Sequence, residues 1–288
     1  MLSSEQIKKR INYIGGSDAA CLLGLSRWKT PLALWAEKTK QILPEDISGK
    51  MQVRLGNKME DTIAELFTEE TGLKVRRVNE TIYHREYPFL AANIDRKIVG
   101  EDYILECKHT SERRANEWNE GVPIEYLIQC YHYLAVTDCK KAYLACLIGN
   151  QELKIKEIDR DEKILSDLIV KEVYFWREFI EKKIMPGVVD NDDSVLYRLF
   201  PHAEQGQIIQ LGDDVNAKCE MIESLNQDKF TVEKQIDKLK NELKALIKEN
   251  ETGDTGRYQI RWSNVKKEAY TVAASEYRQF RIACVNRK

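Results

Sequence analysis

The chain has 288 residues, of which 43% are hydrophobic and 32% charged, and its formal net charge is −2. A chain of this length can bury the core of one large domain or of a domain with an appendage. Its near-neutral charge does not favour a general polyanion-binding protein. No run approaches the roughly 18 apolar residues of a membrane-spanning helix, and the first residues lack the apolar core of a secretory signal. We therefore expect a protein of the cytoplasm with no membrane partner.

Cysteine spacing and charge distribution indicate which classes of ligand to expect. The seven cysteines are scattered without a CxxC pair or zinc-ligand spacing, so we expect reduced thiols and no iron–sulfur cluster. Residues 1–43 carry seven basic and three acidic side chains, and residues 257–288 carry eight basic and two acidic ones. Two separate basic regions on a neutral chain indicate local phosphate contacts, although solvated faces that bind nothing are the alternative.

The first third of the chain has helical signals. "GSDAACLLGL" is typical of a turn and a short helix with Ser17 or Asp18 as N-cap. "TPLALWAEKTK" predicts a second helix capped by Thr30. An apolar stripe over residues 56–71 predicts a third helix that ends at Gly72.

Strand signals follow, and they set the expected fold class. They predict a central mixed sheet flanked by helices, an α/β (α+β) domain over residues 1–190. A segment rich in proline, glycine and acidic residues marks the boundary at residues 185–194. The expected strands cover residues 73–78, 81–88, 90–99, 102–110, 141–149 and 152–159, and the expected helices cover residues 123–136 and 161–183.

Residues 191–288 predict a helical arm followed by a small hairpin. Apolar residues spaced 4-3-4-3 form a short coiled-coil-like seam, which Asn226 and Lys229 interrupt on its N-terminal side. We expect residues 257–262 and 266–272 to pair as a β-hairpin before a last basic helix. The seam residues are Val232, Ile236, Leu239, Leu243 and Leu246.

Three charged residues on two successive strands carry the expected chemistry. Residues i and i+2 of a strand point to one face, so Glu106 and Lys108 of "YILECKHT" stand side by side. Asp95 lies on the preceding strand, and the two carboxylates can meet at one end of the sheet. A cation between them would relieve their repulsion, and hard oxygen ligands suit Mg²⁺ or Mn²⁺. Lys108 could then orient the attacking water or stabilise charge on phosphorus.

The D-x(10)-E-x-K spacing alone is also compatible with an ordinary Glu–Lys pair on a surface strand. With its setting it resembles the signature of the PD-(D/E)xK nuclease superfamily, with a restriction-endonuclease-like core, although Ile94 stands where a proline is common. The resemblance implies that Glu60, on the helix "LGNKMEDTIAELF", is a third acidic metal ligand. It also matches Gln129 and Tyr133 of "IQCYHYLAV" to the Q-x-x-x-Y element of the exonuclease branch.

The N-terminal stretch "RINYIGGSDAACLLGLSRWKTP" is similar to the opening of the YqaJ-type viral recombinases, the phage lambda exonuclease-like group. This resemblance implies that Arg10 and Ser17, seven residues apart, hold the 5′ phosphate of DNA. Backbone N–H groups after two glycines also suit an anion, although a plain helix cap is the alternative. Trp28, in the turn "LSRWKTP", could stack on a base or wedge open a duplex end.

The resemblance implies a Mg²⁺-dependent deoxyribonuclease of a phage or prophage, in the cytoplasm of a bacterial host. It implies a 5′-to-3′ exonuclease on linear double-stranded DNA that prepares tails for a single-strand annealing recombinase partner. A homo-oligomer is compatible with the arm. Two alternatives stay open: a structure-specific or nicking endonuclease on the same fold, and a non-catalytic DNA-binding or assembly protein.

Overall fold

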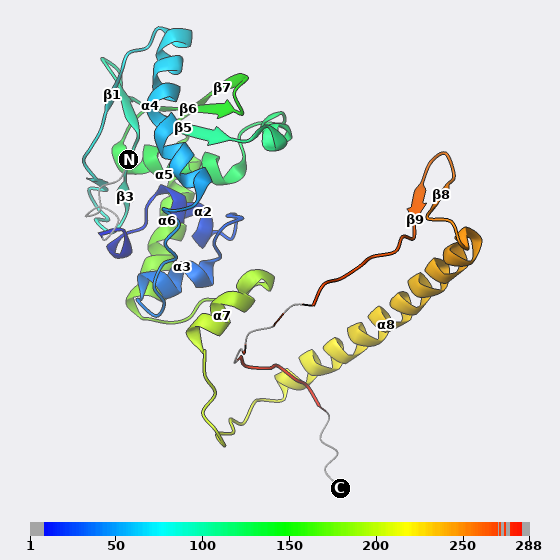
Figure 1. The fold of residues 1–288 in the computed structure, drawn as a ribbon. Helices are drawn as coiled ribbons and strands as arrows, with labels where there is room; N and C mark the ends of the chain where they lie inside the picture. Colours follow the sequence, from blue (N-terminus) through cyan, green and yellow to red (C-terminus); the bar gives the residue numbers. More distant parts are fainter. Residues whose placement is uncertain (1–8, 270, 272–273, 275–276, 284–288) are drawn as a thin grey trace. The chain divides into compact units, whose positions relative to one another are not determined.

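The computed structural model describes residues 9–269, 271, 274 and 277–283 (Figure 1). It divides into two compact units, Met1–Phe200 and Pro201–Lys288. The first unit extends ten residues beyond the expected 190 because Val195 of α7 (Asp193–Leu199) is buried in its core. Across the described residues, no helix combines the length and apolar character needed to cross a membrane.

A five-stranded mixed sheet forms the centre of the first unit, in the order β1-β4-β5-β6-β7. The pair β5–β6 is parallel and the other neighbours are antiparallel, which confirms the predicted mixed sheet. The expected strand 90–99 is interrupted, because Ala91–Ala92 (β3) pairs with Ile82–Tyr83 (β2) outside this sheet. The strands are β1 Val75–Arg77, β4 Arg96–Ile98, β5 Tyr103–Thr110, β6 Lys141–Ile148 and β7 Glu152–Asp159.

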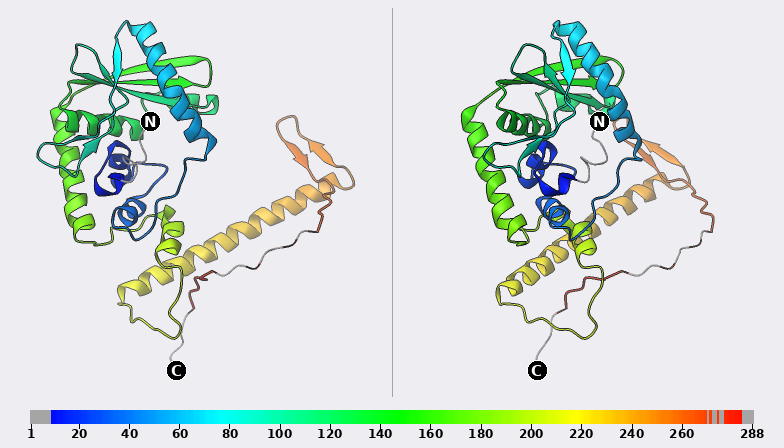
Figure 2. Two further views of the ribbon diagram at one scale, coloured as in Figure 1. Left: turned by 60° about the vertical axis from the view of Figure 1, so that its left-hand side comes forward. Right: turned by 90° about the vertical axis from the view of Figure 1, so that its left-hand side faces the viewer.

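Helices cover both faces of this sheet (Figures 1 and 2). On one face α4 (Met51–Thr71) contributes Phe67 to the same hydrophobic cluster as Leu105 of β5. On the other face α5 (Ile124–Thr137) contributes Leu134 to the same hydrophobic cluster as Leu144 of β6. Alternation along β5 therefore turns Glu106 and Lys108 toward α5. The remaining helices of this unit are η1 Arg10–Asn12, α2 Gly16–Leu22, α3 Pro31–Lys38, η2 Glu112–Trp118, α6 Glu162–Tyr174, η3 Phe175–Glu181 and η4 Asp190–Asp192.

Most of the expected helix signals are confirmed. Thr30 Oγ1 accepts a hydrogen bond from the backbone N–H of Ala33 and caps α3, and Gly72 ends α4 with a φ of 73°. The predicted cap of α2 is wrong, because the N-cap is Gly15 and Asp18 lies one turn inside the helix. The Asp18 carboxylate still accepts a hydrogen bond from the backbone N–H of Gly15. Asp18 therefore stabilises the start of α2 from the third position of the helix.

The second unit contains α8 (Asp214–Ile247), a 34-residue helix, followed by β8 (Thr252–Asp254) and β9 (Gln259–Arg261). The predicted partner of the hairpin is wrong: β9 pairs with β8, upstream of it, around a turn with Gly256 at a φ of 79°. Residues 266–269 are not a strand, and residues 270 and 272 lie outside the described residues. The described part of the expected last helix, residues 277–283, is not helical.

Candidate active site

Asp95, Glu106 and Lys108 meet where β4 and β5 pair. The register places Arg96 opposite Leu105, so Asp95 comes beside the residue that follows Leu105. Asp95 Oδ2 accepts the backbone N–H of Cys107 at 2.8 Å, and Lys108 Nζ lies 2.7 Å from Glu106 Oε1. The structure thus brings together the three charged groups that the strand periodicity predicted.

Gln129 of α5 connects the charged groups on β5. Its Nε2 donates to Glu106 Oε1 at 2.7 Å and to Tyr133 Oη at 2.9 Å, and its Oε1 accepts from Lys108 Nζ at 3.1 Å. One amide therefore holds the carboxylate and the ammonium in a defined geometry. Burial raises the pKa of Tyr133, and the nearby Glu106 raises it further, so this hydroxyl keeps its proton.

The site has the features of a divalent-cation site. Glu106 Oε2 is buried and has no hydrogen-bond partner among the described residues. Burial raises the pKa of Asp95, and the Glu106 and Glu60 carboxylates raise it further. In the described chain no group of three or more His, Cys, Asp or Glu side chains has metal-binding geometry. Two carboxylates suffice for Mg²⁺, which keeps several waters, so this donor set fits such an ion.

Lys108 is held in its charged form. Burial alone would lower the pKa of Lys108, but the Glu106 and Asp95 carboxylates outweigh burial and raise the pKa above its ordinary value. The ammonium also lies 4.8 Å from the ring centre of Tyr126, within cation–π range.

Glu60 does not join this pair in a common group of carboxylates. It is buried on α4, and its Oε1 lies 2.6 Å from Nη1 of Arg96, whose other Nη binds Asp61 at 2.5 Å. Glu60 forms an ion pair with Arg96. Helix spacing alone does not predict this pair.

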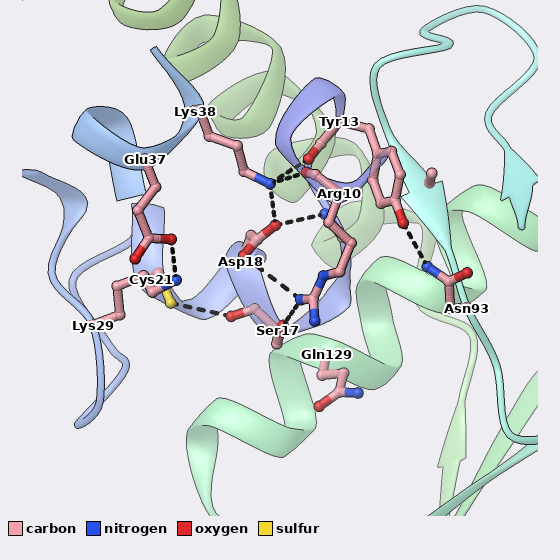
Figure 3. Close-up of polar contacts among 12 residues, drawn as sticks. Arg10, Tyr13, Ser17, Asp18, Cys21, Lys29, Glu37, Lys38, Asn93 and Gln129 are labelled. Atoms are coloured by element: carbon pink, nitrogen blue, oxygen red, sulfur yellow. Dashed lines mark hydrogen bonds and ion pairs between the residues drawn. The ribbon is translucent and has the colours of Figure 1, made fainter. Parts of the chain in front are cut away.

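A second polar cluster surrounds Arg10 and Ser17, at the start of α2 (Figure 3). Arg10 Nη2 donates to Ser17 Oγ at 2.6 Å and lies 3.9 Å from Asp18 Oδ1. The two residues named by the resemblance are thus in direct contact. Among the described residues, Ser17 and Asp18 do not take up every N–H group of the Arg10 guanidinium.

Lys38 fixes the position of this cluster, and the sequence analysis missed it. Its buried Nζ donates to the carbonyls of Arg10 at 2.6 Å and Tyr13 at 2.5 Å, and to Asp18 Oδ2 at 2.7 Å (Figure 3). Burial alone would raise the pKa of Asp18, but the Lys38 and Arg10 charges outweigh it and lower the pKa well below the usual range. The one available signal was that Lys38 follows Leu34 by four residues, on the buried face of α3.

Gly16 joins the two clusters. A Cβ at this position would lie 2.5 Å from Cε1 of Tyr133 and 2.9 Å from Cγ of Gln129. Helix α2 therefore rests directly on the face of α5 that carries the active-site amide, and any side chain there would force them apart.

Trp28 lies at the surface close to Lys108. Its side chain is 58% exposed and packs 5.8 Å, centre to centre, from Tyr126, the ring that faces the Lys108 ammonium. Arg27 and Arg114 lie 5.5 and 5.9 Å from the Trp28 ring. An exposed ring flanked by two cations suits base stacking near a phosphate backbone.

A buried pair, His132 and Glu172, connects α5 to its neighbours. His132 lies between Glu172 Oε1, 2.7 Å from Nδ1, and the carbonyl of Ala91, 3.0 Å from Nε2. Burial alone would lower the pKa of His132, but Glu172 and then the Ala91 carbonyl outweigh it and raise the pKa above 6.5. The pair links α5, α6 and β3, the elements behind Gln129.

The chain is similar to a known protein family. The family model described as the YqaJ-like viral recombinase domain matches residues 6–140. Bacillus subtilis (strain 168) YqaJ is 35% identical over 270 residues, covering 92% of this chain and 84% of YqaJ.

Two solved structures are similar in fold to a large part of the chain. The alkaline exonuclease LHK-Exo from Laribacter hongkongensis has a TM-score of 0.53 and 18% identity, covering 63% of this chain and 94% of LHK-Exo. Its complex with dAMP has a TM-score of 0.54 and 19% identity, covering 68% and 97%. The predicted α/β core is confirmed, and its fold is similar to that of LHK-Exo.

Proposed function

Because the chain belongs to the YqaJ-like viral recombinase family, we propose that it is a Mg²⁺-dependent exonuclease that degrades linear duplex DNA from the 5′ end. The observation that carries the proposal is the arrangement of Asp95, Glu106 and Lys108 around the amide of Gln129. The polar cluster of Arg10 and Ser17 packs against the same helix through Gly16. In this proposal the tail so produced serves recombination by a single-strand annealing partner.

Asp95 and Glu106 are the proposed metal ligands, and the Glu106 oxygen without a hydrogen-bond partner is the more available donor. Mg²⁺, or Mn²⁺ in its place, would supply activation of a water and polarisation of the phosphate. Glu60, held by Arg96, would act through water. An observable besides activity is available: Mn²⁺ titration by calorimetry should show a site that Asp95→Asn removes.

Lys108 is the proposed stabiliser of negative charge on phosphorus. Gln129 aligns its ammonium by accepting one hydrogen bond, and the raised pKa keeps it protonated at working pH. Such a preorganised donor typically contributes about 100- to 1,000-fold in rate. Tyr133, which receives a hydrogen bond from Gln129, can offer its own proton to the passing strand.

Arg10 and Ser17 are proposed to bind the terminal 5′ phosphate. Ser17 accepts one guanidinium N–H, and a phosphate can take the remaining donors bidentately. Trp28 is proposed to stack on an unpaired base at the duplex end.

The test is digestion of a linear duplex labelled at one end, with Mg²⁺, Mn²⁺ or EDTA. We expect progressive loss of linear DNA that is faster on 5′-phosphate ends, stops with EDTA and leaves closed circles intact. Lys108→Ala should lose about 100-fold or more. The matched control is Lys156→Ala, which removes an exposed lysine of β7.

Arg10→Gln distinguishes binding of the terminal phosphate from cleavage. It should abolish the preference for 5′-phosphate ends, whereas cleavage of DNA should persist. Cutting of the closed circle would make the protein an endonuclease. DNA binding without any cutting would make it a non-catalytic DNA-binding protein.

A further inference from the structure

The aromatic ring of Tyr126 faces the Lys108 ammonium, and the proposed function assigns this ring no role. Lys108 Nζ lies over the ring, 4.8 Å from its centre. Gln129, whose Oε1 accepts a hydrogen bond from the same ammonium at 3.1 Å, follows Tyr126 by three residues on α5. Residues three apart lie on one face of a helix, so a single turn of α5 presents both groups to Lys108.

The hydrogen bonds of Lys108 leave one of its donors for a substrate. An ammonium has three N–H groups and no acceptor. Glu106 Oε1 lies 2.7 Å from Nζ and Gln129 Oε1 lies 3.1 Å from it, which accounts for two of the three N–H groups. A third strong acceptor from the protein would take up the last N–H group and leave none for a phosphate oxygen. An aromatic face, in contrast, attracts the positive charge as a whole and needs no N–H group directed at it.

Two hydrogen bonds alone do not fix the direction of the remaining N–H group. The ammonium of a lysine ends a flexible four-carbon stem, and it can rotate about the line that joins its two acceptors. The Tyr126 ring adds a third direction of attraction and thereby restricts this rotation. A donor that already points to the place where negative charge develops stabilises the transition state without a cost of reorientation.

Neighbouring rings hold the Tyr126 ring in place. Trp118, which is 2% exposed at the end of η2, stacks on it with ring centres 5.7 Å apart and an angle of 24° between the planes. Trp28 contacts the same ring at a centre-to-centre distance of 5.8 Å. The Tyr126 side chain also packs against the hydrophobic core of the first unit. Because the ring is held on several sides, its contact with Lys108 constrains the lysine more than the ring.

We propose that Tyr126 is a positioning residue of the active site: its ring holds the Lys108 ammonium so that the free N–H group is directed at a phosphate oxygen of the substrate. The inference rests on the proposed function for the identity of that oxygen. The ring face makes the contact, so the Tyr126 hydroxyl is dispensable for it.

Digestion of linear duplex DNA by the full chain tests the role of the ring. Tyr126→Phe keeps the ring face and should keep kcat. Tyr126→Leu removes the ring and should lower kcat by about 10-fold, with the KM for DNA nearly unchanged, because the ring acts on Lys108 and not on the bound strand. A loss that appears only in KM would overturn the proposal.

Fluorination separates the charge of the ring face from the size of the ring. Tyr126→Phe variants that carry one, two or three ring fluorine atoms have nearly the same volume, but each fluorine withdraws negative charge from the face that attracts a cation. We expect kcat to fall with each added fluorine, whereas the urea unfolding curves should coincide. Equal kcat values across the series would overturn the proposal.

Tyr131 provides the matched control on the same helix. It is half-buried and lines a groove beside Ile158 of β7. Five residues separate it from Tyr126, which places its side chain about 140° around the helix axis. Tyr131→Leu removes a ring of the same size and should leave kcat unchanged. An equal loss of kcat in Tyr131→Leu and Tyr126→Leu would assign the effect to the packing of α5 and overturn the proposal.

Nuclear magnetic resonance of isotope-labelled lysine tests the contact without any cleavage of DNA. A methylene group that lies over an aromatic face resonates upfield, and Lys108→Ala identifies the signal of Lys108. Tyr126→Phe should keep the upfield position, and Tyr126→Leu should lose it. A Lys108 signal that stays in place in Tyr126→Leu would overturn the positioning contact. Absence of cleavage by the unsubstituted chain would instead contradict the proposed function, so the two failures are distinguishable.

Discussion

The two units of this protein treat charge and apolar surface in opposite ways. In the first unit, ionised groups such as Lys38, Asp18 and Glu106 are buried, and each is met by a partner of opposite charge. In α8 the charged groups are solvated and large apolar groups are exposed. A buried ion pair fixes the positions of its two side chains, and the loss of one of them is strongly destabilising. An exposed apolar surface is typical of an interaction site. Substitutions should therefore act very differently in the two units.

The largest expected effect comes from breaking the buried pair in the first unit. Lys38→Met leaves the buried Asp18 with only the more distant Arg10 charge and removes the ammonium that two carbonyls accept from, so we expect a loss of about 3–5 kcal/mol in the free energy of unfolding. Urea unfolding measures it. The exposed α6 lysine variant Lys171→Met is the control, and an equal effect of both variants would contradict the role of Lys38.

The next effect is steric. Gly16→Ala should cost about 1–3 kcal/mol of stability, because the added methyl overlaps Tyr133. It should also slow DNA digestion, since it displaces Gln129. Gly56→Ala is the matched control in open space on α4, and we expect it to stabilise by about 0.5–1 kcal/mol. Similar unfolding curves for the two variants would argue against the close contact.

A smaller effect is pH-dependent. The raised pKa of His132 means that the stability from the Glu172 pair is fully present below about pH 6.5 and is lost as pH rises through the folded-state pKa. The loss is about 1.4 kcal/mol for each pKa unit of the shift. Unfolding between about pH 5 and pH 9 measures it. Glu172→Gln, whose amide can donate to neutral His132, should show a flatter profile. Equal slopes in both proteins would exclude this pair as the cause.

The smallest effect belongs to the second unit. Lys238→Gln removes an exposed ion pair with Glu242 at 3.9 Å, and we expect a change of no more than about 0.5 kcal/mol. Thermal unfolding followed by far-UV circular dichroism measures this change. A loss comparable to that of Lys38→Met would remove the contrast between the two units.

The sequence predicted those features that depend on neighbouring residues better than those that depend on the whole fold. Glu106 and Lys108 followed from strand periodicity and Asp95 from its place on the preceding strand, because these rules act over a few residues. Gln129 and Tyr133 followed from their resemblance to a family motif. Lys38 was missed because lysine is normally solvated, and only the fold brings three acceptors from residues 10–18 to it. The hairpin partner of β9 was misplaced because its true partner, "TGD", has little strand propensity.

Gly16 also bears on the length of the product. Because Gly16 has no side chain, α2 and α5 lie in direct contact, and the place proposed for the end of a strand lies at a short distance from the place proposed for its cleavage. If the proposed function holds, a fixed distance between these two places would give cleavage products of one constant length, whatever the base sequence.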